Sequence, residues 1–393
     1  MRKIILVTLI VCITVLSAFT AFASDMTDAD ADEGRLTLTS LDPDSIAAES
    51  AILIEANTGR VLFEKNVSEA LPPASVTKVM TLLLVCEAIE AGSFTLDSKV
   101  MISRNAASMG GSQVFLEEGE EFTVEELLKC TVIASANDAA VALAELTAGS
   151  EEAFVDRMND RAKELGLTKT HFQNTTGLDD ELTDHLTSAY DIAIMSRELI
   201  KHDIILKYSG IWQDSIRDGE FILTNTNRLV RYYSGCTGLK TGYTEKAGFC
   251  ISATAERDGM HLIAVIMGAE SRDSRNDAAR TLFDWGFANF SIYRDDEAYL
   301  ENVNVLRCNT AATSLYVKEY IYLCEKGNKS RIEKVYDIPE TVKAPLAENE
   351  VVGKVKYYLD DKQIGESDIY VKEELEEISR LGLFLKILSA PFD

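Results

Sequence analysis

The order of helix-like and strand-like apolar patterns limits the fold of this chain more than any other feature of its sequence. Residues 51–65 contain two apolar runs around an Asn/Gly turn, which predicts a β-hairpin. Helical spacing then covers residues 72–92 and most of 123–202. The pattern is strand-like over 212–267 and helical again over 277–290. This order predicts an α+β domain, with an antiparallel sheet, helices packed on it and a helical insert.

Polar residues mark the start of several predicted helices. Thr123 and Glu126 have the spacing of a capping box, in which each side chain accepts a hydrogen bond from the backbone N–H of the other residue. Ser150 and Thr187 are the expected caps of two later helices. The strands expected in the second half of this domain are residues 221–224, 237–244, 248–256 and 260–267.

Beyond Tyr299 the chain has the pattern of a second, all-β domain, for which its 393 residues leave room. Asp360-Asp361-Lys362 has the composition of a hairpin turn. The expected strands are residues 303–307, 314–317, 320–324, 331–336, 351–359 and 369–371. Nothing in the sequence of this region suggests chemistry.

The N-terminal residues have the features of a secretory signal peptide. Arg2 and Lys3 precede an apolar run over residues 4–22, and Ala21-Phe22-Ala23 provides a small-x-small exit. Cleavage after Ala23 is therefore expected, although the run is also just long enough to span a bilayer as an uncleaved helix. The acidic segment that follows, residues 24–47, is expected to be a flexible lead-in.

The C-terminal residues show an apolar stripe with helical spacing. The stripe consists of Val371, Leu375, Ile378, Leu381, Leu385 and Leu388. Such a helix could lie on a membrane surface or pack on the β domain, and the pattern alone does not choose between the two. The predicted organisation is a signal peptide (1–23), a lead-in (24–47), an α+β domain (48–298), a β-rich domain (299–370) and an amphipathic tail (371–393).

Composition argues against two classes of function. A net charge of −25 argues against nucleic acid as a partner, because phosphate binding needs clustered Lys and Arg. The four histidines are scattered and there is no Cys-x-x-Cys motif, which argues against a metal site. Cys12 lies in the predicted signal peptide, and the other cysteines could pair in an exported protein. Cys86 and Cys130 fall on apolar helix faces and are expected to be buried thiols.

Ser75 and Lys78 form the candidate catalytic pair. Pro72 and Pro73 can lead into a helix but cannot continue one, so Ser75 is expected at or near a first helical turn. Lys78 follows one turn later on the same helix face. A lysine desolvated by an apolar helix can take the proton of a serine hydroxyl, and the helix N-terminus offers N–H groups to an oxyanion. The alternative is an ordinary capping serine followed by a solvated lysine.

Two further motifs complete a recognisable pattern. Ser135-Ala136-Asn137 lies between two predicted helices, and Lys240-Thr241-Gly242 lies on a predicted strand. Together with Ser75-Val76-Thr77-Lys78, they resemble the motifs of the penicillin-recognising serine hydrolases, and among these the low-molecular-mass penicillin-binding proteins that act as D-alanyl-D-alanine carboxypeptidases. The resemblance implies a β-lactamase/transpeptidase-like domain followed by a small all-β domain. It covers essentially the whole chain and includes residues 72–78, 135–140, 238–244 and 285–287.

The resemblance implies a role for each residue of the first two motifs. Ser75 would attack the carbonyl between the last two D-alanines of a peptidoglycan stem, and Lys78 would take its proton. Ser135 would relay a proton to the departing amine. Asn137 would hold the substrate amide, since its side chain both donates and accepts hydrogen bonds. Water would then hydrolyse the acyl-enzyme, and neither a cofactor nor a metal is implied.

The strand motif would bind the substrate. Lys240 would supply positive potential near the substrate carboxylate, and Thr241 would hydrogen-bond that carboxylate. Gly242 would leave room for the substrate to lie along the strand. The backbone N–H groups of Ser75 and Tyr243 would form the oxyanion hole.

Two other positions bear on the resemblance. Arg275 matches by position the arginine that grips the terminal carboxylate in the family, and a guanidinium suits that task. The alternative is a solvated arginine ahead of the final helix. Members of the family often have histidine where this chain has Thr176, in Asn174-Thr175-Thr176-Gly177-Leu178. Threonine cannot do acid–base work near neutral pH, so slow deacylation would follow if that histidine matters.

The resemblance implies an exported penicillin target that trims peptidoglycan pentapeptides. It would bind β-lactam antibiotics covalently and would attach by its tail to the outer face of the cytoplasmic membrane. The same scaffold could instead serve a transpeptidase, a β-lactamase or a catalytically silent wall-binding protein. A β-lactamase needs a second base, and although Asp179, Asp180 and Glu181 lie in a plausible loop, no family-like glutamate motif occurs there. Intact Ser75 and Lys78 argue against a silent protein.

Overall fold

The computed structural model of the chain describes residues 40–178 and 183–389. The predicted signal peptide, most of the predicted lead-in and the acidic residues 179–181 lie outside these ranges. Within them the elements follow the predicted order of hairpin, helices, strands, long helix and short strands. The predicted fold class, an α+β domain followed by an all-β region, is confirmed.

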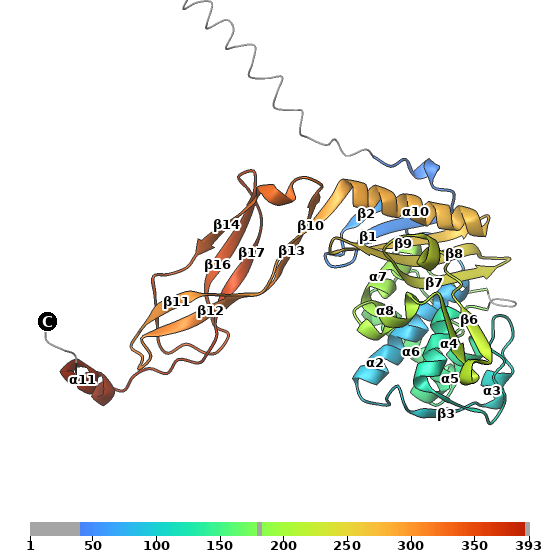
Figure 1. Cartoon of the computed structure of the whole chain (residues 1–393), viewed down its shortest axis with the longest axis horizontal. Helices are drawn as coiled ribbons and strands as arrows, with labels where there is room; N and C mark the ends of the chain where they lie inside the picture. The colour runs from blue at the N-terminus through green and yellow to red at the C-terminus, as the bar shows by residue number, and fades with distance from the viewer. Residues whose placement is uncertain (1–39, 179–182, 390–393) are drawn as a thin grey trace, which may run out of the picture. The chain divides into compact units, whose positions relative to one another are not determined.

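A five-stranded antiparallel sheet organises the α+β domain (Figure 1). Its spatial order is β2-β1-β9-β8-β7. The strands are β1 (Ser50–Glu55), β2 (Val61–Lys65), β7 (Cys236–Thr244), β8 (Gly248–Arg257) and β9 (Met260–Ala269). The predicted hairpin and the three long predicted strands are all present. The hairpin joins the sheet where β1 pairs with β9, so segments far apart in the sequence form one sheet.

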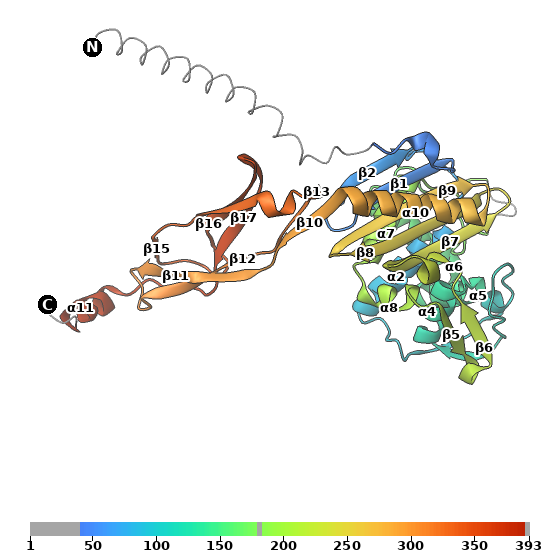
Figure 2. The same cartoon turned by 45° about the horizontal axis from the view of Figure 1, so that its top comes forward.

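Helices cover both faces of this sheet (Figure 1, Figure 2). They are α10 (Arg272–Asn289) on one face and α2 (Lys78–Glu90) and α7 (Ala189–Leu199) on the other. Side chains alternate between the faces along a strand, so Leu53 packs in the core beneath α10, whereas Ile52 and Ile54 pack in the core that contains α2 and α7. Because both faces are covered, the central strands read as nearly continuous apolar runs.

The helical insert lies between β2 and β7 in the sequence. Besides α2 and α7 it contains α3 (Arg104–Ala107), α4 (Val124–Ile133), α5 (Asn137–Ala148), α6 (Glu151–Glu164), α8 (Asp203–Ser209) and α9 (Leu229–Tyr232), with the hairpin strands β3 (Lys99–Met101), β4 (Glu121–Thr123), β5 (Gln213–Ile216) and β6 (Phe221–Thr224). The predicted break in the apolar pattern separates α4 from α5. Ser135 therefore lies at a junction between two buried helices.

The helix caps agree with the prediction at two positions and differ at a third. Thr123 forms its capping box, and Ser150 caps α6. The prediction for Thr187 is wrong, because Ser188 caps α7 with its side chain. The hydroxyl of Thr187 lies 2.7 Å from that of Thr170. A tertiary contact engages the predicted cap, and the next residue supplies the capping oxygen instead.

The final helix of this domain, α10, begins at Arg272 and not at residue 277 as apolar spacing predicted. Ser271 and Ser274 form a capping box at its start. The first turn of α10 is polar, so periodicity alone missed it. As a result Arg275 belongs to the first turn of a helix that packs on the sheet.

The predicted flexible lead-in is wrong for its last residues. Residues 40–47 are described, and Ile46 is buried in the core beneath α10. The ammonium group of Lys65 donates to the carbonyl oxygen of Ile46 at 2.8 Å. An apolar anchor and a backbone contact therefore hold the chain just before β1.

Cys86 and Cys130 are buried in the helical core, as the sequence predicted. Neither forms a disulfide. Burial raises the pKa of the Cys86 thiol to about 12, and burial likewise raises the pKa of Cys130. Both thiols therefore act as small apolar groups.

The all-β region consists of two sheets. A two-stranded sheet pairs β10 (Phe290–Asp295) with β13 (Tyr320–Glu325), and a second sheet has the order β14-β16-β17-β12-β11-β15. The strands of the second sheet are β11 (Ala298–Leu306), β12 (Ala312–Val317), β14 (Ile332–Asp337), β15 (Thr341–Lys343), β16 (Val351–Leu359) and β17 (Lys362–Val371). Leu315, Val355 and Ile369 lie in its core. The predicted turn at residues 360–362 connects β16 to β17.

The predicted helical stripe of the tail is wrong over its first half. Val371 ends β17 and is fully buried, and it pairs with Leu315. Leu375 is also buried, and its backbone exchanges two hydrogen bonds with Leu346. Strand pairing therefore holds residues whose spacing suggested a helix, and helix α11 spans only Arg380–Ser389. Among the described residues, no helix is both long and apolar enough to cross a membrane.

Candidate active site

Ser75 lies in a short 3-10 turn, Ala74–Thr77, that runs directly into α2. Two glycines pack against this turn from opposite segments. A Cβ atom on Gly242 of β7 would lie 2.8 Å from the backbone nitrogen of Ser75, and one on Gly177 would lie 1.8 Å from the carbonyl oxygen of Ala74. Only glycine permits so close an approach at either position. The turn is therefore held between the sheet and the loop at residues 174–178.

Lys78 is fully buried at the start of α2 and makes three polar contacts. Its amine nitrogen lies 3.0 Å from the Ser75 hydroxyl oxygen, 2.6 Å from Asn137 Oδ1 and 2.9 Å from the Thr176 carbonyl oxygen. Burial lowers the pKa of Lys78 well below its ordinary value, and the charge of Lys240 adds to this, while Asp138 opposes it.

Burial favours the neutral form of this amine. Such an amine has two N–H donors and one lone pair. The side-chain oxygen of Asn137 and the carbonyl of Thr176 can only accept hydrogen bonds, so they take the two donors. The lone pair is then directed at the hydroxyl of Ser75. Lys78 is consequently arranged to take the proton of Ser75.

Asn137 opens α5 and keeps its amide in one orientation. Its side-chain nitrogen donates to the Gly110 carbonyl oxygen at 2.7 Å, so Oδ1 faces Lys78. Its backbone N–H donates to the carbonyl oxygen of Ser112, also at 2.7 Å. The predicted contact of Asn137 with substrate stays a prediction. The structure adds an orienting contact with the amine of Lys78.

Ser135 and Lys240 form a second hydrogen-bonded pair. The amine of Lys240 donates to the Ser135 hydroxyl at 2.7 Å and to the carbonyl oxygen of Thr241 at 2.8 Å. Burial and the charge of Arg275 lower the pKa of Lys240 to about 7. Near neutral pH this lysine can therefore exist in both charge states, and its proton lies beside a hydroxyl that can pass it on.

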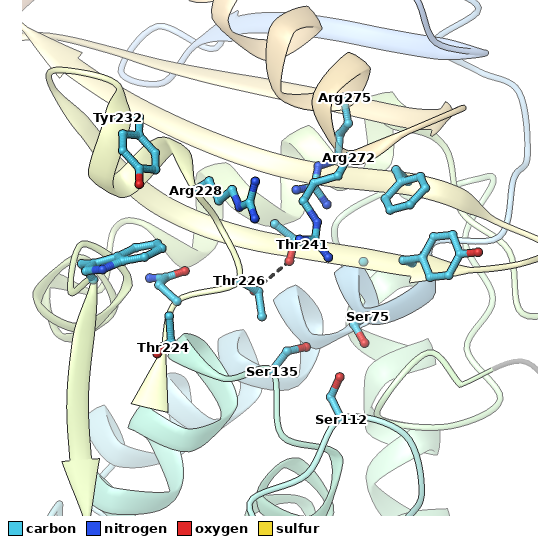
Figure 3. Close-up of a pocket in the computed structure, with 15 residues that line it drawn as sticks. Ser75, Ser112, Ser135, Thr224, Thr226, Arg228, Tyr232, Thr241, Arg272 and Arg275 are labelled. Carbon is cyan, nitrogen blue, oxygen red and sulfur yellow. Dashed lines mark hydrogen bonds between the residues drawn. The ribbon is translucent and has the colours of Figure 1, made fainter. Parts of the chain in front are cut away.

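A cavity of about 790 Å³ opens over these residues (Figure 3). Its lining residues are Ser75, Ser112, Ser135, Trp212, Thr224, Asn225, Thr226, Arg228, Tyr232, Thr241, Gly242, Tyr243, Phe249, Arg272 and Arg275. Among the described residues, the lining includes three arginines and no carboxylate, in a protein whose net charge is −25. Such a cavity attracts anionic groups and repels cations.

Arg275 is 3% exposed, so the alternative of a solvated arginine is wrong. Its guanidinium donates twice to Asn276 Oδ1, at 3.1 and 3.0 Å. Burial lowers the pKa of Arg275 to about 10, and the charges of Arg272 and Arg228 act in the same direction. A buried cation with two cationic neighbours would be stabilised by an incoming carboxylate.

The predicted site did not include the residues that lie on the far side of Thr241 from Ser75. Figure 3 shows Thr226 and Arg228 there, and the Thr241 hydroxyl donates to that of Thr226 at 2.7 Å. The segment is held by Asn225 and Asn227, because Asn225 Oδ1 accepts from the backbone N–H of Asn227. A polar run directly after the predicted strand at 221–224 was the available signal.

The structure thus brings the predicted site residues together. Ser75, Lys78 and Asn137 share one hydrogen-bond network, and Ser135 and Lys240 share another. The other predicted residues, together with Ser75 and Ser135, line the same cavity: Thr241, Gly242, Tyr243 and Arg275.

Comparison with known proteins agrees with this geometry. Residues 37–271 match the family model described as D-alanyl-D-alanine carboxypeptidase, and residues 287–377 match the penicillin-binding protein 5, C-terminal domain. D-alanyl-D-alanine carboxypeptidase DacF of Bacillus subtilis is 42% identical over 338 residues, which cover 84% of this chain and 86% of the relative.

Two solved structures are also similar. Penicillin-binding protein 5 from Haemophilus influenzae has a TM-score of 0.71 at 30% identity, covering 87% of this chain and 100% of its own. Penicillin-binding protein D2 from Listeria monocytogenes, in its ampicillin-bound form, has a TM-score of 0.57 at 30% identity, covering 63% of this chain and 99% of its own. With its hydrogen-bonded serine–lysine pair and both family models matched, the chain belongs to the D-alanyl-D-alanine carboxypeptidases of the penicillin-binding protein family.

Proposed function

We propose that this protein is a serine-type D-alanyl-D-alanine carboxypeptidase that removes the terminal D-alanine from peptidoglycan pentapeptides through an acyl-enzyme on Ser75. The observation that carries the proposal is the environment of Lys78. Burial favours its neutral form, in which two N–H groups donate to Asn137 and Thr176 and the lone pair faces the hydroxyl of Ser75. A lysine poised in this way is an activated base next to a nucleophile.

The reaction begins with attack of the Ser75 oxygen on the carbonyl carbon of the penultimate D-alanine. Lys78 takes the hydroxyl proton as the bond forms. The developing oxyanion would be held by the backbone N–H groups of Ser75 and Tyr243. Gly242 supports this proposal, because its lack of a side chain lets β7 lie close to the backbone nitrogen of Ser75. The C–N bond then breaks, and Ser135 relays to the departing amine the proton that Lys78 took, which returns Lys78 to its neutral form.

The leaving D-alanine carries a carboxylate, and the cavity supplies groups suited to it. Thr241 and Arg275 both line the cavity, and Lys240 lies buried behind Ser135. Hydrogen bonds between a cation and a carboxylate are stronger than neutral ones, so the terminal carboxylate fixes the register of the substrate. The amide of Asn137 would contact the peptide on the acyl side.

The acyl-enzyme must finally react with water. Thr176, where relatives often have histidine, offers its carbonyl to Lys78 and accepts from the N–H of Leu178 with its hydroxyl. Neither group can remove a proton from water. Deacylation therefore depends on Lys78 itself, and we expect it to be slow. A transpeptidase reaction, with an amine in place of water, would use the same groups.

β-Lactam antibiotics are the expected inhibitors. The Listeria relative was solved with ampicillin bound, and its site lies on the same fold. We propose that penicillins acylate Ser75 and that slow deacylation leaves a lasting adduct. A β-lactamase would instead need a second base, and the acidic residues 179–181 considered for that role lie outside the described residues.

The proposal is tested with the purified protein and its Ser75→Ala variant. Each is incubated with labelled penicillin and, separately, with a peptide ending in D-Ala-D-Ala. We expect a lasting adduct and free D-alanine with the unchanged protein and neither with the variant. D-alanine release by Ser75→Ala would overturn the assignment of the nucleophile. An adduct without D-alanine release would favour a silent penicillin-binding protein.

We further propose that the protein works outside the cytoplasm, where its peptidoglycan substrate lies, and that α11 attaches it to the membrane surface. Leu381, Phe384, Leu385 and Leu388 are between 56% and 69% exposed on this helix. An apolar surface of this kind is stabilised when it inserts among lipid chains. The acidic residues that precede α11 give little attraction to anionic lipid.

Truncation after Ser379 tests the anchor without damaging the β-rich region, because Leu375 and Ile378 are retained. We expect the truncated protein to stop sedimenting with phosphatidylcholine vesicles and to release D-alanine at the original rate. The binding of the full chain should change little with salt. A truncated protein that still sediments would contradict the anchor.

A further inference from the structure

His185 is a buried histidine with no place in the mechanism above. It is 2% exposed and lies in the segment that leads into α7. Its Nε2 atom is 2.8 Å from the hydroxyl of Thr77, which ends the turn of Ser75 and directly precedes Lys78. Its Nδ1 atom is 3.0 Å from the backbone nitrogen of Gln173.

The direction of each hydrogen bond follows from this geometry. The N–H of Gln173 can only donate, so Nδ1 of His185 carries no proton and accepts. The neutral ring then has its proton on Nε2 and donates it to Thr77. The hydroxyl of Thr77 in turn donates to the carbonyl oxygen of Ala74 at 2.8 Å. A one-way chain of hydrogen bonds therefore runs from Gln173 to the carbonyl that precedes Ser75.

The end of this chain is a strained position. Ala74 has φ of 48°, a left-handed conformation that is unfavourable for a residue with a Cβ atom. Its carbonyl oxygen is the atom on which Gly177 packs closely. Such a conformation persists only where the surroundings hold it. Release of the Ala74 carbonyl would let the peptide unit that carries the Ser75 N–H rotate.

We propose that His185 is a positioning residue, which acts through Thr77 to hold the turn that presents the Ser75 hydroxyl to Lys78 and the Ser75 N–H to the oxyanion. This inference rests on the proposed function of Ser75. It assigns to a buried imidazole the task of orienting the nucleophile and no proton transfer to substrate. The ring has to be neutral for the chain to run in this direction.

The charge state agrees with this requirement. Burial lowers the pKa of His185 to about 4, and the charges of His171 and Lys246 act in the same direction. The ring is consequently neutral at the pH values at which a cell-wall enzyme works. The ring of Phe172 packs against it in an edge-to-face arrangement, with ring centroids 5.8 Å apart.

The test uses matched pairs of variants. Thr77→Val removes the hydroxyl and keeps the shape, whereas Thr77→Ser keeps the hydroxyl. His185→Leu removes both nitrogens, whereas His185→Gln retains one acceptor and one donor. For Thr77→Val and His185→Leu we expect the rate of acylation by penicillin to fall about 10- to 100-fold, because misplacing a reacting group by about 1 Å costs this much. Thr77→Ser and His185→Gln should recover most of the rate.

A control variant separates positioning from general stability. Thr81 lies one turn further along α2, is also fully buried and donates to the carbonyl oxygen of Thr175 at 2.7 Å. Thr81→Val therefore removes one contact at Thr175, whereas the N–H groups of Thr176 and Gly177 stay bound to Asn174 Oδ1, so the part of the loop that faces the turn of Ser75 keeps its position. We expect it to lower the melting temperature as much as Thr77→Val and to leave acylation unchanged.

The kinetic pattern is the decisive readout. A misplaced nucleophile lowers kcat for D-alanine release and leaves KM nearly unchanged, because Arg275 and Thr241 are undisturbed. The double variant Thr77→Val/His185→Leu should be no slower than either single variant, since both substitutions break the same chain of hydrogen bonds. Folded Thr77→Val that acylates at the original rate would overturn the proposal, as would an equal loss in Thr81→Val. If His185→Leu does not fold, the two Thr77 variants decide, and failure of the unchanged protein to form an adduct would instead refute the proposed function.

Discussion

In the α+β domain three basic side chains, Lys78, Lys240 and Arg275, are buried without an ion pair to a carboxylate among the described contacts. In the β-rich region, by contrast, cations lie at the surface beside carboxylates, as Arg294 does with Glu319 at 2.6 Å. Burial of an unpaired charge costs several kcal/mol, whereas an exposed pair contributes little either way. Within the described part of the chain, this costly arrangement occurs only beside the cavity, which is where the proposed function needs it.

The two regions also differ in how the chain compensates its charges. Within the α+β domain the buried amines are met by neutral acceptors, such as Asn137 Oδ1 and the carbonyl of Thr176. Neutral acceptors stabilise an amine without fixing it in the charged state, so the pKa stays low. A carboxylate in the same place would raise the pKa and abolish the base. A buried lysine that is to act as a base therefore needs neutral hydrogen-bond acceptors as partners and not carboxylates.

The largest expected effect comes from Lys78→Arg. A guanidinium keeps its proton in proteins and cannot serve as a base, so acylation by penicillin should fall by about 100- to 10,000-fold. Acylation is measured by labelled penicillin on protein whose folding has been checked by thermal unfolding. Normal acylation in this variant would show that Lys78 is not the base and that its low pKa has another purpose.

The next largest effect is expected for Arg275→Ala. Loss of a charge-assisted contact costs about 1.5–3 kcal/mol, which corresponds to about one to two decades in kcat/KM for a D-Ala-D-Ala peptide. Acylation by penicillin should fall much less. Arg280→Ala is the matched control, because Arg280 lies on the same helix in an exposed pair with Asp277. Equal losses on all substrates would indicate a folding defect instead.

A smaller effect is expected in the way the free energy of unfolding depends on pH. The pKa of Lys240 is about 7 in the folded protein and lies near its ordinary value of 10.5 in the unfolded protein. Above about pH 7 the unfolded state therefore binds more protons, so this group makes the free energy of unfolding rise with pH, and Lys78 acts in the same sense. Between about pH 7 and 8.5, Lys240→Met should remove up to about 1.4 kcal/mol per pH unit of that rise.

Denaturant unfolding of the two proteins at several pH values measures this slope. Below about pH 6 the two curves should run parallel, because Lys240 is then charged in both the folded and the unfolded state and adds no pH dependence. Parallel curves over the whole range would contradict the low pKa of Lys240, and with it the contrast between buried amines and surface pairs.

The smallest effect is expected in the β-rich region. Arg294 and Glu319 have side chains that are 41% and 38% exposed, so Arg294→Ala should change the free energy of unfolding by no more than about 1 kcal/mol. D-alanine release should be unchanged. A loss of several kcal/mol would show that surface pairs in this region carry more of its stability than the comparison allows.

Local rules of the sequence predicted most elements. Thr123, Ser150 and the turn at residues 360–362 were identified because caps and turns depend on a few neighbouring residues. The spacing of Ser75 and Lys78 likewise follows from one turn of a helix. The resemblance to known motifs also predicted that Ser135 and Lys240 belong to the same site as this pair.

Long-range contacts account for the errors. Ser188 caps α7 in place of Thr187, whose hydroxyl contacts that of Thr170. Val371 lies in a strand and not in the predicted helix, because it pairs with Leu315. Ile46, expected in a flexible segment, is buried beneath α10. In each case a partner distant in the sequence outweighed a local preference, which is worth only about 1 kcal/mol or less per residue.

The sequence by itself determined which groups can do chemistry here: a serine and a lysine on one helical turn, a second hydroxyl, and a lysine on a strand. Only the tertiary structure decided their state. It buried Lys78, aimed the carbonyl of Thr176 and the amide of Asn137 at it, and linked His185 through Thr77 to the turn of Ser75. The pKa of an amine and the angle of a hydroxyl depend on desolvation and on neighbours from other segments, and neither is encoded in local spacing.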